Sequence, residues 1–468
     1  MVVKVDRSIK RARLAVAFAL ERLRQQVADA RSKQYPGDHI GPTRWLNLVC
    51  GLIDTAFEYL NESDKVGIST DAEAGLITDA AQLATESYQC LVLMRGAGTD
   101  ELSYSIVTPL DRWFSQLRVT NATFFRAELV ANYELSFIQD RPFRRVRNPA
   151  ASLTEALQIN WPFLRVTVPA KAFSIVPHLA IVAHEIGHAL FDKVGWEISA
   201  FVDSEVPILT ANIKDRLAVA ALDSSTTKIL NSVFQSWWEE FSADAFAFYL
   251  TGPAIFFSLP EFFQFLGSGY GLSETHPAND LRRSALFAKI IEGGGESFAA
   301  IFEKHLKQNL TVDFNSPLIV PTPAATEIFK DMRSEGHSRE KAAVLAELHG
   351  SIDKLIPAVY RHVGKFLEEN ANDAIYLPKR FDQDLADHLE PLLGAVPPIE
   401  VGALDQGKTP TEFASILNVG WAALLTRLSD LRVRISGPDP FGSELAERLQ
   451  GLLSKAVELS EARRVWQN

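Results

Sequence analysis

The stretch from Leu179 to Leu190 constrains this chain most, because it combines a buried helical pattern with three ionisable side chains. It reads Leu-Ala-Ile-Val-Ala-His-Glu-Ile-Gly-His-Ala-Leu and is apolar nearly all round, so we expect a helix inside the protein. His184, Glu185 and His188 interrupt this pattern near its middle. Burying such groups without partners costs several kcal/mol each, so the fold must supply a partner for them.

The spacing of the two histidines indicates what that partner is. Residues four apart share one face of a helix, so His184 and His188 can bind one ion, while Glu185 projects about 100° round the axis. This is the His-Glu-x-x-His zinc signature, in which the glutamate is free to act on a metal-bound water. The cofactor predicted from the sequence is therefore Zn²⁺.

A third protein ligand is needed, because catalytic zinc takes three ligands and keeps an open position for water. Glu240 is our candidate, since its neighbours on a long predicted helix are apolar and its carboxylate should be buried. Asp244 lies one turn further along the same face, where it can accept the free ring N–H of His184. Glu239 is the competing candidate, but Ala243, four residues after it, offers no such group.

Composition excludes several classes of function. The net charge of −11 argues against nucleic acid as the main partner, because phosphate binding requires a basic excess. The two cysteines, Cys50 and Cys90, exclude a disulfide scaffold and favour the cytoplasm. The apolar run Leu14–Leu20 is too short for a signal peptide, and Gly and Pro break the most apolar window, Ala245–Phe265. We therefore expect a soluble protein with no integral membrane span.

The expected fold class is mainly α with a small β-sheet (α+β). Apolar and polar residues alternate over Phe124–Ile138 and Trp161–Val168, which predicts strands, and an exposed strand edge could bind an extended peptide. Helical patterns cover most of the rest. Besides the central helix, they run over about 6–33, 43–61, 71–94, 108–118, 207–222, 226–250, 323–334, 338–370, 380–393, 410–432 and 440–466.

Three regions are expected along the 468 residues, since the chain exceeds the usual size of one domain. Residues 1–120 form an N-terminal helical region, residues 121–310 the catalytic domain, and residues 311–468 a C-terminal helical region. The two flanks are expected to wall the cleft, restrict access to it and dock a protein partner.

Three motifs occur in order along the chain. They read His184-Glu185-Ile186-Gly187-His188, then Glu240-Phe241-Ser242-Ala243-Asp244, then Thr275-His276-Pro277 followed by Arg282. Together they resemble the gluzincin metallopeptidases of the CAAX prenyl protease and HtpX-like kind, whose pattern is His-Glu-x-Gly-His, Glu-x-x-Ala-Asp and a later His-Pro with an arginine behind it. The resemblance covers roughly residues 160–290. It implies zinc, peptide-bond hydrolysis and a zincin-like core with large helical flanking regions.

This chain departs from those families in one respect, because they are commonly membrane-embedded and the chain shows no spanning helix. A second resemblance, carried by the helix that contains Glu240, Ala243 and Asp244, is to the ImmA/IrrE-like group. Members of that group cut repressor proteins in solution, which suits a chain of this kind.

The function expected from the sequence is that of a zinc-dependent metalloendopeptidase acting on a protein or peptide. Glu185 would take the proton of a zinc-activated water and pass it to the leaving amine. His276 is the candidate donor to the developing oxyanion, with Arg282 orienting it or neutralising nearby charge. Tyr249 and Tyr270 could do the same, and the sequence does not choose between them.

Three alternatives remain at this level. The chain could be a catalytically silent zinc-binding regulatory or interaction protein, although a purely structural zinc site has no use for Glu185. It could be an ImmA/IrrE-like peptidase that cuts one regulatory protein. The His motif could also be incidental within a helical scaffold protein.

Overall fold

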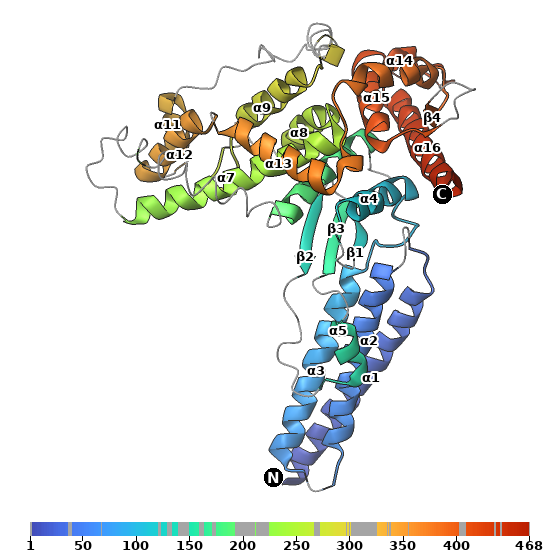
Figure 1. Ribbon diagram of the computed structural model, residues 1–468. Helices are drawn as coiled ribbons and strands as arrows, with labels where there is room; N and C mark the ends of the chain where they lie inside the picture. Colours follow the sequence, from blue (N-terminus) through green and yellow to red (C-terminus); the bar gives the residue numbers. More distant parts are fainter. Residues whose placement is uncertain are drawn as a thin grey trace. The chain divides into compact units, whose positions relative to one another are not determined.

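The computed structural model divides into two compact units, Met1–Ser174 and Ile175–Asn468 (Figure 1). It describes residues 2–35, 40–66, 68–119, 123–128, 133–138, 149–158, 163–170, 175–191, 211, 224–265, 272–295, 297–298, 300, 325–334, 336, 338–353, 355–401, 409–434, 437–439 and 442–467. The three regions expected from the sequence stay a prediction, and the expected boundary at 310 lies outside the described residues.

The first unit is built on three long helices, α1 (Val2–Arg31), α2 (Ile40–Ser63) and α3 (Thr70–Leu93), which lie side by side (Figure 1). The short helix α5 (Ala151–Gln158) packs against α2. The other elements are α4 (Tyr104–Gln116), β1 (Thr123–Glu128), β2 (Glu134–Ile138) and β3 (Phe163–Pro169). One glycine of α2 allows a close approach. A Cβ at Gly51 of α2 would lie 2.6 Å from Leu153 Cα of α5, so only glycine lets these helices pack so tightly.

A three-stranded sheet completes this unit, in the order β1-β3-β2. Strand β3 pairs parallel with β1 and antiparallel with β2, with Val166 opposite both Phe125 and Leu135. Because β3 is central, its side chains are buried on both faces, including Leu164 and Thr167. The edges β1 and β2 belong to this unit, whereas the His-Glu-x-x-His helix belongs to the other.

The second unit is almost entirely helical (Figure 1). It begins with the 3₁₀ turn η1 (Val176–Leu179), which runs directly into the helix at 180–191. The other elements are α7 (Ser224–Thr251), α8 (Ala254–Phe265), α9 (Asn279–Glu292), α11 (Ala325–Ser334), α12 (Arg339–Ile352), α13 (Ile356–Asn370), η2 (Asn372–Ala374), α14 (Arg380–Leu393), β4 (Glu400–Val401), β5 (Thr409–Pro410), α15 (Phe413–Thr426), η3 (Leu428–Asp430) and α16 (Ser443–Gln467).

The helix at 180–191, the motif helix, is anchored at its start by residues from far along the chain. The indole N–H of Trp421 in α15 donates to the Pro177 carbonyl oxygen at 3.2 Å and to Ser258 Oγ of α8 at 3.1 Å. Ser258 Oγ also donates to the same carbonyl, at 3.1 Å. All three residues are buried, so these hydrogen bonds fix the position at which the motif helix begins.

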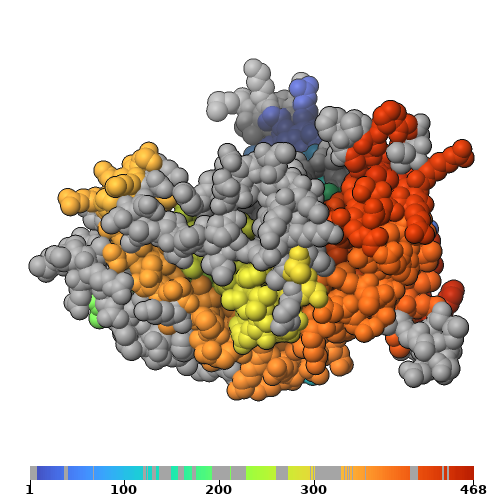
Figure 2. Space-filling view, turned by 90° about the horizontal axis from the view of Figure 1, so that it is seen from above, coloured from blue at the N-terminus to red at the C-terminus, as the bar shows by residue number. Residues whose placement is uncertain are grey.

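Segments after residue 350 also cover the end of α9. A Cβ at Gly293 would lie 2.8 Å from Pro378 Cγ, so the end of α9 meets the turn before α14. In the space-filling view the yellow surface of α9 borders the orange surface of the following helices (Figure 2). The C-terminal segments therefore pack onto the part of the chain that contains the motifs.

The prediction of a mainly helical protein with a small sheet is confirmed. The single helix expected over 338–370 is wrong: α12 ends at Ile352 and α13 begins at Ile356, with a proline in its first turn. Helix α5 was not expected from the sequence pattern, and the helix expected at 207–222 lies largely outside the described residues. Over the described ranges, we find no helix with both the length and the apolar character needed to cross a membrane.

Candidate metal centre

Two closely packed helices carry the first two sequence motifs. The helix at 180–191 holds His184 and His188, and α7 holds Glu240. A Cβ on Gly187 would lie 2.5 Å from Ala243 Cα, so the helix backbones approach closely only because residue 187 is glycine. Gly187 lies one residue before a histidine of the motif, and Ala243 lies one turn after Glu240. The close approach therefore places the two motifs next to each other.

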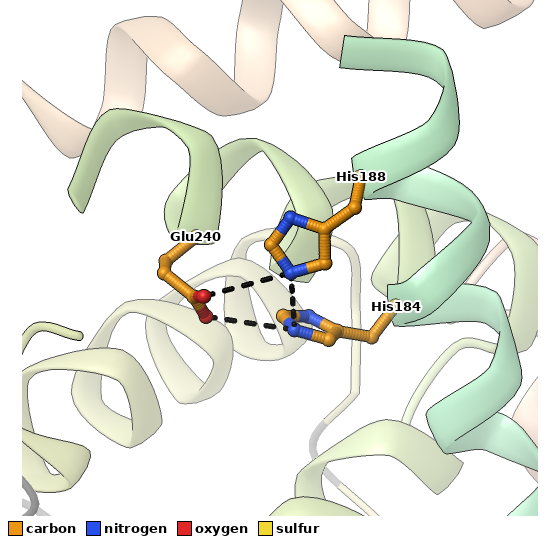
Figure 3. A group of neighbouring side chains, drawn as sticks. All are labelled: His184, His188 and Glu240. Carbon is orange, nitrogen blue, oxygen red and sulfur yellow. Dashed lines mark hydrogen bonds and ion pairs between the residues drawn. The ribbon is translucent and has the colours of Figure 1, made fainter. Parts of the chain in front are cut away.

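His184, His188 and Glu240 form a compact triangle of donor atoms, and all three side chains point toward one another (Figure 3). The two Nε2 atoms lie 3.1 Å apart. His184 Nε2 is 3.5 Å from Glu240 Oε2, and His188 Nε2 is 3.5 Å from Glu240 Oε1. The structure thus brings the three predicted ligands together.

These donors fit a metal ion by both distance and chemistry. Bonds of about 2.0–2.1 Å in a tetrahedral arrangement place two ligand atoms roughly 3.3 Å apart, close to the three distances of the triangle. Two imidazole nitrogens that face each other at 3.1 Å need a cation or a shared proton between them. A cation held by the three groups would satisfy both nitrogens.

The outer nitrogen of each histidine faces a carboxylate. His184 Nδ1 lies 3.0 Å from Asp244 Oδ1, and His188 Nδ1 lies 3.0 Å from Glu239 Oε1. An imidazole whose Nδ1–H points at a carboxylate keeps its Nε2 lone pair available for a metal. Both rings are therefore oriented as metal ligands, with their Nε2 atoms toward the shared point.

Glu239 is the residue whose position the sequence reasoning missed. The sequence offers it only as a rival to Glu240, yet the structure places it beside His188, outside the donor triangle. Adjacent residues on a helix point about 100° apart, so Glu239 and Glu240 can reach opposite sides of one histidine. That pair of acids, next to a two-histidine motif, is the signal that could have found it.

Arg282 supplies the positive charge that stabilises the buried acids. Its Nε and Nη2 each donate to Asp244 at 2.7 Å, and its Nη1 lies 3.2 Å from Glu240 Oε2. Arg282 is 1% exposed and Asp244 is fully buried, so the two charges depend on each other. The sequence placed Arg282 near this site; in the structure it contacts the acids of α7.

The pKa directions follow from this packing. Burial alone would lower the pKa of His184, but Asp244 and Glu240 outweigh it and raise that pKa to about 9. Burial alone would raise the pKa of both acids, but Arg282 and then His184 hold them well below their usual range. Without an ion, the centre is thus an array of ionised side chains.

The third motif contributes His276 at the exposed side of the centre. Its Nε2 lies 3.4 Å from Glu240 Oε1, its Nδ1 lies 2.9 Å from Thr275 Oγ1, and about half of its side chain is exposed. Burial lowers its pKa, and Glu240 offsets part of that effect. His276 therefore stands at the solvent-facing edge of the donor triangle.

The remaining candidate residues lie in different places. Glu185 is half-buried on the motif helix and is not part of the donor triangle. The hydroxyl of Tyr249 donates to the Tyr360 carbonyl oxygen at 3.0 Å, so it is engaged elsewhere. Tyr270 lies outside the described residues. Of the oxyanion donors considered, His276 is the one that the described part of the chain brings to the centre.

Comparison of the chain with protein-family models, curated proteins and solved structures found no match. The chemistry of the centre therefore has to be inferred from its own side chains.

Proposed function

We propose that this chain is a zinc-dependent peptidase with a zincin-like core, and that the donor triangle is its active centre. The observation that carries the proposal is the convergence of His184, His188 and Glu240 at 3.1–3.5 Å, with Glu185 next to the first ligand and outside the triangle. A purely structural zinc site is closed by four protein ligands, whereas three described ligands leave a position open.

The ion would supply a Lewis acid that polarises a scissile carbonyl and makes a water molecule acidic. Glu185 has the chemistry to accept the proton of that water and return it to the leaving amine. Its place on the motif helix, one residue after a ligand and half-exposed to solvent, suits this role. Asp244 and Glu239 hold the two imidazoles in the tautomer that binds metal.

His276 is proposed to donate a hydrogen bond to the developing oxyanion. The Thr275 hydroxyl, 2.9 Å from Nδ1, can donate to that nitrogen and so leave the ring proton on Nε2. Nε2 is the atom that faces the centre, at 3.4 Å from Glu240. Arg282, buried against the acids, then serves to balance charge beneath the ligands.

The decisive experiment compares wild-type protein with Glu185→Gln. We expect both to bind about one equivalent of zinc, while cleavage of an unfolded protein or a peptide library falls by about 100-fold or more in the variant. Retained cleavage at the wild-type rate would rule out Glu185 as the general base. Bound zinc with no cleavage by either protein would favour the catalytically silent zinc-binding alternative.

A further inference from the structure

A second site is suggested by a cavity of about 400 Å³ in the first unit, between α1, α2 and α5. This size suits a small molecule. Its walls combine three arginines with polar and apolar groups. The arginines are Arg24, Arg31 and Arg44, and the other lining residues come from α2 and α5.

The spacing of these residues shows why they converge. Arg24 and Arg31 are seven residues apart on α1, which is two helical turns and one face. Arg44, Asn47 and Asp54 follow one another along one side of α2. Both helices therefore turn polar faces toward the same cavity, and the face of α1 is basic, although most of their remaining contact is apolar.

Only one of the three arginines has a carboxylate partner within the described residues. Arg24 pairs with Asp54 at 3.1 Å and stacks 4.1 Å over the Phe57 ring. Arg31 donates to Asn47 Oδ1 at 2.7 Å, and it has no carboxylate within ion-pair distance in the part of the chain described. Arg44 makes no ion pair or hydrogen bond with a described residue and is half-buried. Arg44 is thus available to an anion, and Arg31 is held at the cavity by Asn47 and the Cys50 side chain, with no carboxylate to balance its charge among the described residues.

Helix α5 forms a firmly placed wall of the cavity. The close approach at Gly51 seats it on α2, and the Ala150 N–H donates to the buried Thr55 hydroxyl at 3.0 Å. Ser152 Oγ donates to Asp54 at 3.2 Å, which holds that acid toward Arg24. Asp54 is therefore already neutralised, whereas Glu155, the other acid of the lining, makes no ion pair with a described residue.

We propose that this cavity binds a small organic anion, with its phosphate or carboxylate on Arg31 and Arg44. Guanidinium groups bind both kinds of oxyanion through paired N–H donors. The apolar body of the ligand would lie against Ala156 and the Cys50 side chain. The site stands apart from the metal chemistry, because none of its residues belongs to the second unit.

The test uses the full-length protein and three probes: inorganic phosphate, phenyl phosphate and benzoate. Binding is measured by calorimetry, and each of Arg31→Gln and Arg44→Gln should weaken it about tenfold or more. Arg22→Gln, an exposed position on α1 outside the cavity, should leave the affinity unchanged. Phenyl phosphate binding more tightly than benzoate identifies a phosphate ligand, and the reverse order identifies a carboxylate.

A second readout needs no variant. Burial raises the pKa of both thiols, but Cys50 lines the cavity and is half-buried, whereas Cys90 is buried and its pKa is raised to about 12, which keeps that thiol unreactive. Millimolar probe should slow maleimide labelling of Cys50 several-fold. Labelling unchanged by all three probes, or equal affinity in wild type and both arginine variants, would overturn the proposal.

Discussion

At the scale of single residues, the two histidines of the centre differ in how firmly they are held. His184 is 6% exposed and faces Asp244, which a buried arginine holds in place. His188 is partly exposed and faces Glu239, whose side chain is 39% exposed. Water weakens an exposed pair more than a buried one, so the two carboxylates should contribute unequally to metal binding.

Replacing the buried carboxylate of Asp244 should therefore weaken zinc binding more than replacing the exposed carboxylate of Glu239. We expect Asp244→Asn to weaken zinc binding about 10- to 100-fold, because it loosens His184 and leaves Arg282 without one of its two charges. Glu239→Gln is the matched control at the other histidine and should cost less than about tenfold. Competition with a chelating dye measures the zinc affinity of both variants. An equal loss of affinity in the two would contradict the prediction that Asp244 contributes more than Glu239.

Proton release should accompany metal binding. The raised pKa of His184, about 9, means that the metal-free protein carries an extra proton at pH 7, which the ion must displace. Apparent affinity should hence rise with pH up to about 9 and then level off. In the metal-free protein the same shift stabilises the fold fully below the ordinary pKa of 6.5, and this stabilisation is lost as pH rises through about 9.

Calorimetry in two buffers of different ionisation enthalpy measures this release. We expect about one proton or more per zinc at pH 7. An observed enthalpy that does not depend on the buffer would mean that His184 is already neutral in the metal-free protein.

At the scale of elements, local patterns were enough to predict most helices but not how they meet. The expected ranges near 71–94 and 380–393 fall within a residue of α3 and α14. The break between α12 and α13 was missed because the apolar pattern continues through it, although Pro357 fits the first turn of a new helix. The central place of β3 depends on pairing between distant segments, which no local pattern contains.

The same limit applies to the centre. Helical spacing relates Glu240 to Asp244 and His184 to His188, because these pairs are local. The contacts of Arg282 join residues 38 or more apart in sequence, so spacing could place it only near the site. Its bidentate pairing with Asp244 could be learned only from the fold.

The close approach of the motif helix to α7 should tolerate no side chain at residue 187. Gly187→Ala would put a Cβ 2.5 Å from Ala243 Cα, and separating the helices would move both histidines away from Glu240. We expect a loss of about 1–3 kcal/mol in stability, together with loss of tight zinc binding. Gly75→Ala is the control, since nothing lies within 4 Å of its Cβ on α3, and it should stabilise by about 0.5–1 kcal/mol. Chemical denaturation and zinc analysis of both variants give the comparison.

At the scale of the whole molecule, the three candidate metal ligands belong to one of two compact units. A ligand stabilises only the cooperative unit that binds it, so removing zinc with a chelator should lower one thermal transition and leave the other in place. Calorimetry on the full chain tests this. His184→Ala should reproduce the chelated profile and show no further change when chelator is added. If removing zinc lowered the whole thermal transition uniformly, the two units would unfold as one cooperative unit.

The hydrogen bond between Trp421 and Pro177 joins an early and a late part of the chain. The two residues are 244 apart in sequence, yet the hydrogen bond between them fixes the start of the helix that carries two ligands. A ribosome therefore exposes His184, His188 and Glu240 well before α15 emerges. Nascent chains should acquire their metal late, and a chain arrested before α15 should present all three ligands without holding zinc firmly.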